Sequence, residues 1–320
     1  MSTHYFETAS TVGNLLAAIP AALGYVPANR LVVITTHRPN RTIEEVRMIV
    51  ALDLSTSLGS IAELPERCGI TIRNTAGAYL VAIGEPSRHG EARALLNAAD
   101  TALRNSDIRV HARIITESLT DANRWQNIDT GETGENVDYR DSVHVAEAVY
   151  TGARVVGSRE EIVAEFAESD EAPEVPEGVT FNLGEIADEI ARAVEGGSAS
   201  ADLATRAGIA ITSCVHLRDS MLYRGTANPR GTAALWTKLA SQLRGLSRIE
   251  ALIVAGMMYY TAGDGPRSNV ALETADNLAA ALGVPLPRLG LLLTAAFQSG
   301  ITPEDMKRLL ATGADLQARK

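Results

Sequence analysis

The hydrophobic pattern of this chain changes type near its midpoint, and this change limits the folds that it can adopt. In the first half, short apolar or β-branched runs at 31–36, 46–54, 78–83 and 108–117 alternate with helical patterns. From residue 182 onward, every periodic segment has helical spacing. Strands that alternate with helices are typical of a layered α/β domain, whereas helices alone form bundles or stacked pairs. We therefore predict an α/β fold class with a mixed-sheet N-terminal domain, followed by an all-α helical bundle or helix-pair array.

The spacing of the elements in the first half indicates a mixed sheet. The connection between the runs at 31–36 and 46–54 is too short for a crossover helix, so this pair should be an antiparallel hairpin. An amphipathic helix at 90–104 separates two later runs, which allows them to be parallel neighbours. Further predictions are helices at 11–23, 56–68, 142–151 and 159–168, a fifth strand at 124–128, and a Gly-rich loop at 129–140.

The second half reads as helices separated by Gly, Pro and Asn. The predicted helices span 184–196, 200–223, 230–244, 247–261, 267–282, 286–299 and 302–316. Asn228 and Thr302 each precede a proline, which favours them as helix N-caps. No self-similarity at a fixed period is present, so the helices do not indicate a repeat family.

The net charge of −10 is concentrated in one stretch of the chain. Residues 158–197 contain twelve acidic and two basic side chains, and the rest of the chain is balanced. Within this stretch, the acidic segment 169–181 contains two prolines, which is typical of a linker. We predict an α/β domain with trailing helices at 1–168, this linker, and a helical domain at 182–320. The acidic stretch is either a solvated surface or a docking surface for a basic partner protein.

Composition and motifs argue against several classes of function. Aromatic residues make up only 4% of the chain and no basic stripe is present, so nucleic acid is not an expected partner. The chain has no Walker loop, no G-x-G-x-x-G turn and no G-x-S-x-G motif. Its six histidines are scattered without metal-ligand spacing. We therefore expect no metal, no cofactor and no catalytic residue that a known motif would identify.

The cysteines and the apolar runs favour a cytoplasmic location. Cys68 and Cys214 lie far apart in apolar patterns, as expected in a reducing compartment. No apolar run approaches the length of a membrane span, and the N-terminus lacks a basic leader. We expect no membrane association.

Polar residues that interrupt apolar surroundings are the candidate binding residues. They are Asp53, Arg124, Arg218, Asp219 and Asp264. Asp53 lies near the end of a predicted strand, where α/β sheets commonly bind ligands. An Arg–Asp pair between helices is either a hydrogen-bonded structural node or a site for an anion or small metabolite, because Arg binds carboxylate and phosphate with two parallel hydrogen bonds.

Short motifs in a fixed order across residues 10–310 carry a family resemblance. They are the run GYVPANRLVV with Gly24, Tyr25 and Pro27, then Trp125, then the block 142–161 with Arg159 and Glu160, then Arg218-Asp219, and finally Gly263-Asp264-Gly265. This order resembles the actinobacterial domain of unknown function 4192 family. The resemblance implies an actinobacterial or actinophage cytosolic setting and assigns no activity. The chain has Arg30 and Pro266 where the family pattern has serine and alanine.

Three functions are consistent with these observations. We expect first a non-enzymatic protein-interaction or regulatory scaffold protein, with the stretch 158–197 as a contact surface. The second is a homo-oligomeric structural component. The third is an enzyme or small-metabolite binder with a polar site that involves Arg218, Asp219 and Asp264.

Overall fold

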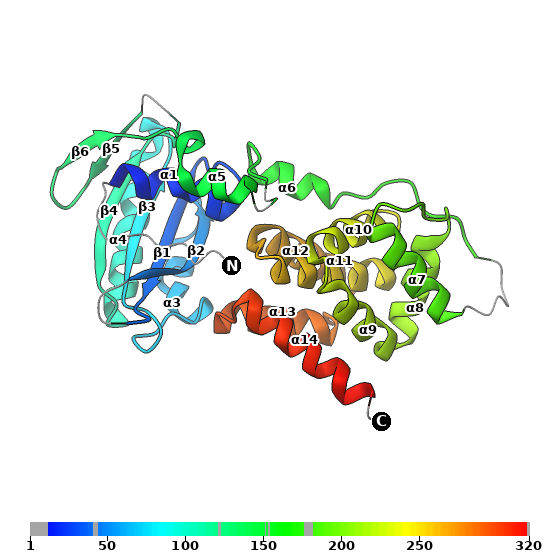
Figure 1. Cartoon of the computed structure of the whole chain (residues 1–320). Helices are drawn as coiled ribbons and strands as arrows, with labels where there is room; N and C mark the ends of the chain where they lie inside the picture. The colour runs from blue at the N-terminus through cyan, green and yellow to red at the C-terminus, as the bar shows by residue number, and fades with distance from the viewer. Residues whose placement is uncertain are drawn as a thin grey trace. The chain divides into compact units, whose positions relative to one another are not determined.

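The computed structural model describes residues 12–40, 44–120, 123–150, 152, 154–175 and 182–318, with side chains described up to residue 312. The chain divides into two compact units, Met1–Arg159 and Glu160–Lys320. We call them the α/β unit and the helical unit. All strands of the described residues lie in the first unit, and the described secondary structure of the second is helical (Figure 1).

Six strands form one mixed sheet in the α/β unit. They are β1 (Arg30–His37), β2 (Glu45–Asp53), β3 (Gly77–Ile83), β4 (Val110–Thr116), β5 (Arg124–Asn127) and β6 (Thr133–Glu135), in the spatial order β2-β1-β3-β4-β5-β6. β1 pairs antiparallel with both β2 and β3, and β3 pairs parallel with β4. β5 and β6 continue the sheet in antiparallel pairing. The predicted hairpin and the mixed sheet are therefore confirmed.

Helices cover both faces of this sheet (Figure 1). On one face lie α2 (Leu58–Ala62), α3 (Leu64–Arg67) and α4 (His89–Asn105), and on the other lie α1 (Val12–Leu23) and α5 (Val143–Tyr150). The core beneath α4 joins apolar residues of the helix, such as Leu96, to strand residues such as Leu31 and Leu80, all fully buried. Burial of such side chains is the main favourable term in folding.

Two predictions in the α/β unit are wrong in detail. The helix predicted at 56–68 is broken into α2 and α3, because Pro65 has no N–H to donate to the preceding turn. The loop predicted at 129–140 contains the short strand β6. A Cβ at Gly134 would lie 2.5 Å from Cζ2 of Trp125, so the indole ring lies directly over this glycine. That cross-strand contact is not visible in the local sequence pattern.

The helical unit is built around one buried helix. Its helices are α6 (Arg159–Glu165), α7 (Leu183–Val194), α8 (Leu203–Ser213), α9 (Val215–Gly225), α10 (Pro229–Ser241), α11 (Gly245–Thr261), α12 (Gly265–Ala281), α13 (Arg288–Ser299) and α14 (Pro303–Ala318). Every residue of α11 from Ala251 to Thr261 is buried, as expected for a helix that is apolar all round. Asn228 accepts from the N–H of Gly231, and Thr302 from that of Asp305, so both predicted N-caps are confirmed.

The single helix predicted at 200–223 is wrong. Cys214 has extended backbone angles (φ −136°, ψ 98°) and separates α8 from α9. The hydroxyls of Thr212 and Ser213 donate to the carbonyls of Gly208 and Ile209. These side-chain hydroxyls hydrogen-bond to backbone carbonyls in the last turn of α8. Such local bonds favour the end of a helix at this point.

The acidic segment after α6 lies along the helical unit as far as it is described. The N–H of Ser169 donates to Ser241 O at 2.9 Å, and the N–H of Ala172 donates to Gln242 O at 3.1 Å. Residues 176–181 of the segment predicted as a linker lie outside the described residues. Among the described helices, none is long and apolar enough to cross a membrane.

Candidate functional site

Arg218 and Asp219 form a polar cluster near the beginning of α11. Arg218, on α9, donates to Asp219 at 3.0 Å and to Glu250 of α11 at 3.3 Å. Its side chain is 11% exposed. Burial raises the pKa of Glu250, and the positive charge of Arg218 only partly offsets this effect. The arginine therefore neutralises a half-buried carboxylate between two helices.

Asp264 belongs to a second cluster, after the end of α11. Asp264 caps α12 by accepting the N–H of Arg267 at 3.2 Å, and it also accepts from the guanidinium groups of Arg267 and Arg230. Arg267 donates two further hydrogen bonds to the carboxylate of Glu165 on α6, at 2.7 and 2.6 Å. These bonds raise the pKa of the Arg267 guanidinium. The cluster joins α6, α10 and α12 through charge-assisted hydrogen bonds.

The two clusters are separated along α11. Glu250 lies in its second turn and Thr261 at its end, about 16 Å apart at 1.5 Å per residue. Arg218 and Asp264 therefore occupy opposite ends of the same helix. Each cluster pairs its charges internally, as a structural node does.

Asp53 and Arg124 lie in the α/β unit on β2 and β5, with three strands between them. Asp53 pairs with Arg30 and accepts from the N–H of Ser55 at 2.8 Å. The hydrogen bond from the Ser55 N–H lowers the pKa of Asp53 more than the charge of Arg30 does. Arg124 is exposed and lies opposite Glu135 of β6.

The carboxyl edge of β3, where an α/β ligand site would be expected, is filled by side chains of the protein itself. A Cβ at Gly84 would lie 2.7 Å from Leu54 Cδ1 and 3.4 Å from the side-chain oxygen of Asn29. The imidazole of His89 lies 3.2 Å from Gly84 O. The edge beside Asp53 is therefore closely packed.

The family-like positions have structural roles that the structure makes visible. Gly24 has a positive φ of 68° and ends α1, and its carbonyl accepts from Val156 at 2.9 Å. Tyr25 forms a β-bridge with Val156, and Pro27 beside it is buried. The run that contains Gly24 and Tyr25 therefore pairs with Val156 in the block 142–161.

Four of the five remaining motif positions lie at helix boundaries, and the fifth, Trp125, lies on β5. Gly263 ends α11 with a positive φ of 77°, and Gly265 begins α12. Arg159 and Glu160 form the start of α6. Trp125 is 6% exposed and covers Gly134, as described above.

Part of the acidic stretch 158–197 pairs with arginines of the helical unit. Glu165 binds Arg267, and Glu168 lies 3.3 Å from Arg244 and 3.4 Å from Arg248. Glu189 lies 2.7 Å from Arg206. These acids are part of the fold, whereas Asp170, Glu171, Glu174 and Glu195 are exposed.

A polar cluster around His111, which was not predicted from the sequence, lies at the other end of the sheet. His111 of β4 lies 3.3 Å from Glu44 Oε2, and its ring centroid is 4.9 Å from that of Tyr79. Its ring fills the space above Gly77, where a Cβ would lie 2.0 Å from Nε2. Burial lowers the pKa of His111, although Glu44 opposes this effect. The three side chains come from separate segments, so no spacing in the sequence could reveal them.

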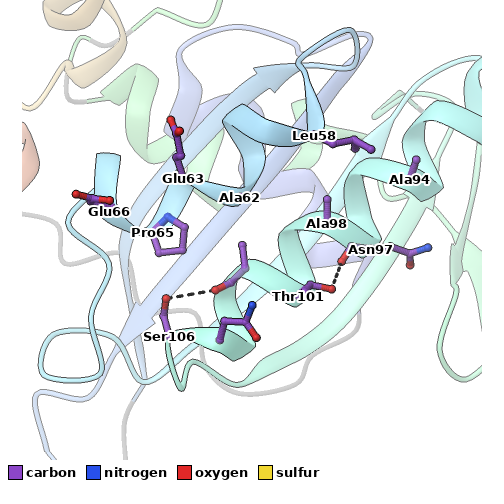
Figure 2. A pocket seen from close by; sticks show the side chains of 12 residues that line it. Leu58, Ala62, Glu63, Pro65, Glu66, Ala94, Asn97, Ala98, Thr101 and Ser106 are labelled. Atoms are coloured by element: carbon purple, nitrogen blue, oxygen red, sulfur yellow. Dashed lines mark hydrogen bonds between the residues drawn. The ribbon is translucent and has the colours of Figure 1, made fainter.

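An open groove lies between α2–α3 and α4, on the outer side of their layer (Figure 2). Its volume is about 650 Å³. Residues of both walls line it: Leu58, Ala62, Glu63, Pro65, Glu66, Ala94, Asn97, Ala98, Thr101, Ala102, Asn105 and Ser106. Most are small or apolar, and none was singled out from the sequence.

The comparisons with known proteins identify a family. A family model described as "domain of unknown function (DUF4192)" matches residues 13–188 and 170–304. Among the curated proteins and among the solved structures, none matches the chain significantly. The resemblance inferred from the motifs is confirmed, and the actinobacterial setting stays a prediction.

Proposed function

The chain belongs to the DUF4192 family, and from the geometry of its α/β unit we propose that it is a protein-interaction protein that binds a polypeptide segment in the groove between α2–α3 and α4. The observation that carries this proposal is the groove itself, a concave surface whose lining combines apolar and polar side chains. Protein-binding grooves of this kind accept a helix or an extended segment along their length.

The lining of the groove suits a polypeptide better than a small metabolite. Leu58 is 54% exposed at the edge of one wall, so its burial by a partner is favourable. Asn97, Thr101 and Asn105 are exposed along the other wall and can hydrogen-bond to a bound chain. Metabolite sites instead enclose the ligand and converge on it with a few polar groups.

A cytosolic setting is part of this proposal. Cys68 and Cys214 are both free thiols, which supports a reducing compartment.

The partner is a second protein, and binding of a second copy of this chain is the alternative that the experiment below distinguishes.

The proposal is tested by photo-crosslinking in cells that produce the protein. A photoreactive amino acid replaces Ala94, which is exposed in the groove wall, or Ala280, an exposed helical alanine of the other unit, as the matched control. The expected result is a discrete crosslinked species from position 94 and not from position 280. Mass spectrometry identifies the attached chain, and attachment of this same chain would indicate the homo-oligomer instead. Equal crosslinking at both positions, or none, refutes the proposal.

A further inference from the structure

The two edges of the sheet differ in how they are protected. Edge strands expose unpaired backbone groups, and proteins commonly shield them by short length, charge or proline. At one edge, β6 has only three residues and no apolar side chain. At the other edge, β2 has nine residues and no proline (Figure 1). Its central run Met48–Leu52 is entirely apolar, so this run lacks the features that keep a second strand away.

The pairing of β2 with β1 fixes which backbone groups point outward. The N–H of Leu54 donates to Asn29 O at 3.1 Å, in register with the regular ladder that runs back to Met48. Hydrogen-bonded and non-hydrogen-bonded pairs alternate in an antiparallel ladder, so Ile49 and Ala51 direct both N–H and C=O away from β1. Among the described strands, β2 has no neighbour on that side.

The side chains of the apolar run are only partly covered. Met48, Val50 and Leu52 pack against the core beneath α4 and keep partial exposure. Ile49 and Ala51, which alternate with them and face the other side of the sheet, are also partly exposed. A strand beside β2 would cover the run on both faces, and this burial is favourable.

The apolar run is complementary to itself. In an antiparallel pair of two β2 strands about a two-fold axis at Val50, Met48 lies opposite Leu52 of the second copy, and Ile49 lies opposite Ala51. The outward N–H and C=O groups of Ile49 and Ala51 then bond to one another. Two β-branched Val50 side chains meet at the axis, which is a favourable cross-strand pair.

The charged residues beside the run favour this register. Arg47 precedes the run and Asp53 follows it, so an axis at Val50 sets opposite charges across from each other at both ends. An axis at Ile49 would instead set Glu45 opposite Asp53, two residues of like charge.

We propose that β2 is the contact surface of a homodimer, in which the β2 strands of two copies pair antiparallel about a two-fold axis at Val50 and join their sheets. A second copy fits this edge because its own β2 supplies a partner for every backbone group that the apolar run leaves unpaired. The surface is separate from the groove, because no residue of β2 lines the groove.

The oligomeric state of the full chain tests the dimer. Sedimentation equilibrium at micromolar concentration should give twice the chain mass of 34.0 kDa. The variant A51P removes only an outward N–H, and proline is tolerated at such positions of edge strands. It should weaken dimerisation at least about tenfold, whereas A51S keeps the N–H and should dimerise like the unsubstituted chain. Circular dichroism establishes that both variants are folded.

Single cysteines in a C68A/C214A background test the register, and they do so even if A51P fails to fold. V50C should form a disulfide between copies under mild oxidation, because side chains that face each other in a non-hydrogen-bonded pair lie within reach. M48C is the matched control, since the two copies of this residue lie about 13 Å apart at about 3.3 Å per residue. A mixture of M48C and L52C should form the mixed disulfide.

Three outcomes overturn the proposal. A monomer at every concentration excludes a second copy as the occupant of this edge and leaves it to a strand of another protein. A dimer that persists in folded A51P places the contact elsewhere than β2. If V50C forms no disulfide, or M48C alone forms one as fast, the register about Val50 is wrong. The proposed function is tested separately, by the crosslink at position 94.

Discussion

Replacing Arg267 by methionine tests the buried arginine cluster that joins α6 to α12. Arg267 is 7% exposed and holds two carboxylates, Glu165 through two hydrogen bonds and Asp264 through one. Methionine fills a similar volume but removes the charge and the hydrogen bonds to both carboxylates. The change leaves two acids beside an apolar side chain.

The expected loss follows from the exposure of the two acids. Breaking a buried ion pair costs about 3–5 kcal/mol, because the remaining charge is desolvated. Glu165 is 30% exposed and regains hydration, and Asp264 retains Arg230 and the N–H of residue 267. We therefore expect R267M to lose about 3 kcal/mol of unfolding free energy, the lower end of this range. The variant R267K keeps the charge but not the forked geometry, and we expect an intermediate loss.

Urea unfolding that is monitored by tryptophan fluorescence can measure this loss of stability in the helical unit alone. Trp236 on α10 is fully buried in the helical unit, and Trp125 lies in the α/β unit. A W125F background leaves Trp236 as the only fluorescent tryptophan. With a slope of about 2 kcal/mol per molar urea, R267M should lower the midpoint by about 1.5 M.

The control is an exposed pair of the same type. Arg224 and Asp188 lie 3.2 Å apart and are 50% and 69% exposed, so R224M should change stability by less than about 0.5 kcal/mol. If R267M lowers the midpoint no more than R224M does, the reasoning about the buried cluster is refuted. Hydrogen exchange of α6 should also accelerate in R267M and not in R224M.

Three further predictions concern single residues. The variant G134A should lose about 1–3 kcal/mol in thermal unfolding, because its Cβ would meet the Trp125 ring, whereas G90A, with nothing within 4 Å of its Cβ, should be neutral or slightly more stable. An NMR titration should place the pKa of His111 below the ordinary value of 6.5. Because the unfolded state then binds the proton more readily, stability should fall as the pH decreases through this region, and less so in H111N; a pKa at or above 6.5 contradicts this. Burial raises the pKa of Tyr260 from 10.0 to about 12, so stability should fall as the pH rises from 10 toward 12, and Y260F should lack this loss; an absorbance titration with a midpoint near 10 in the folded protein would count against it.

Several parts of the fold could be predicted because they depend on neighbouring residues. The alternation of strand and helix runs predicted the α/β unit, and the short connection after residue 36 predicted the antiparallel hairpin. Asn228 and Thr302 predicted two helix starts, since a cap acts on the backbone two or three residues away. The order of short motifs predicted the family.

The candidate residues could be chosen but not grouped from the sequence. Arg218 and Asp264 both lie in polar clusters, yet α11 separates the two clusters because each contacts a different end of this helix. The partner of Arg267 is Glu165, about a hundred residues earlier in the chain. Pairing at such distances depends on how helices are packed, and hydrophobic periodicity does not specify it.

The sequence by itself determined the two-part organisation, the type of most elements and the local charge, because these depend on side-chain order over a few turns or strands. The tertiary structure alone decided which charges neutralise one another, why Gly134 lies under Trp125, and where a groove remains between α2–α3 and α4. A groove is the space that remains between elements after packing. Its walls, Leu58–Ala62 and α4, become neighbours only when both lie on the same face of the sheet.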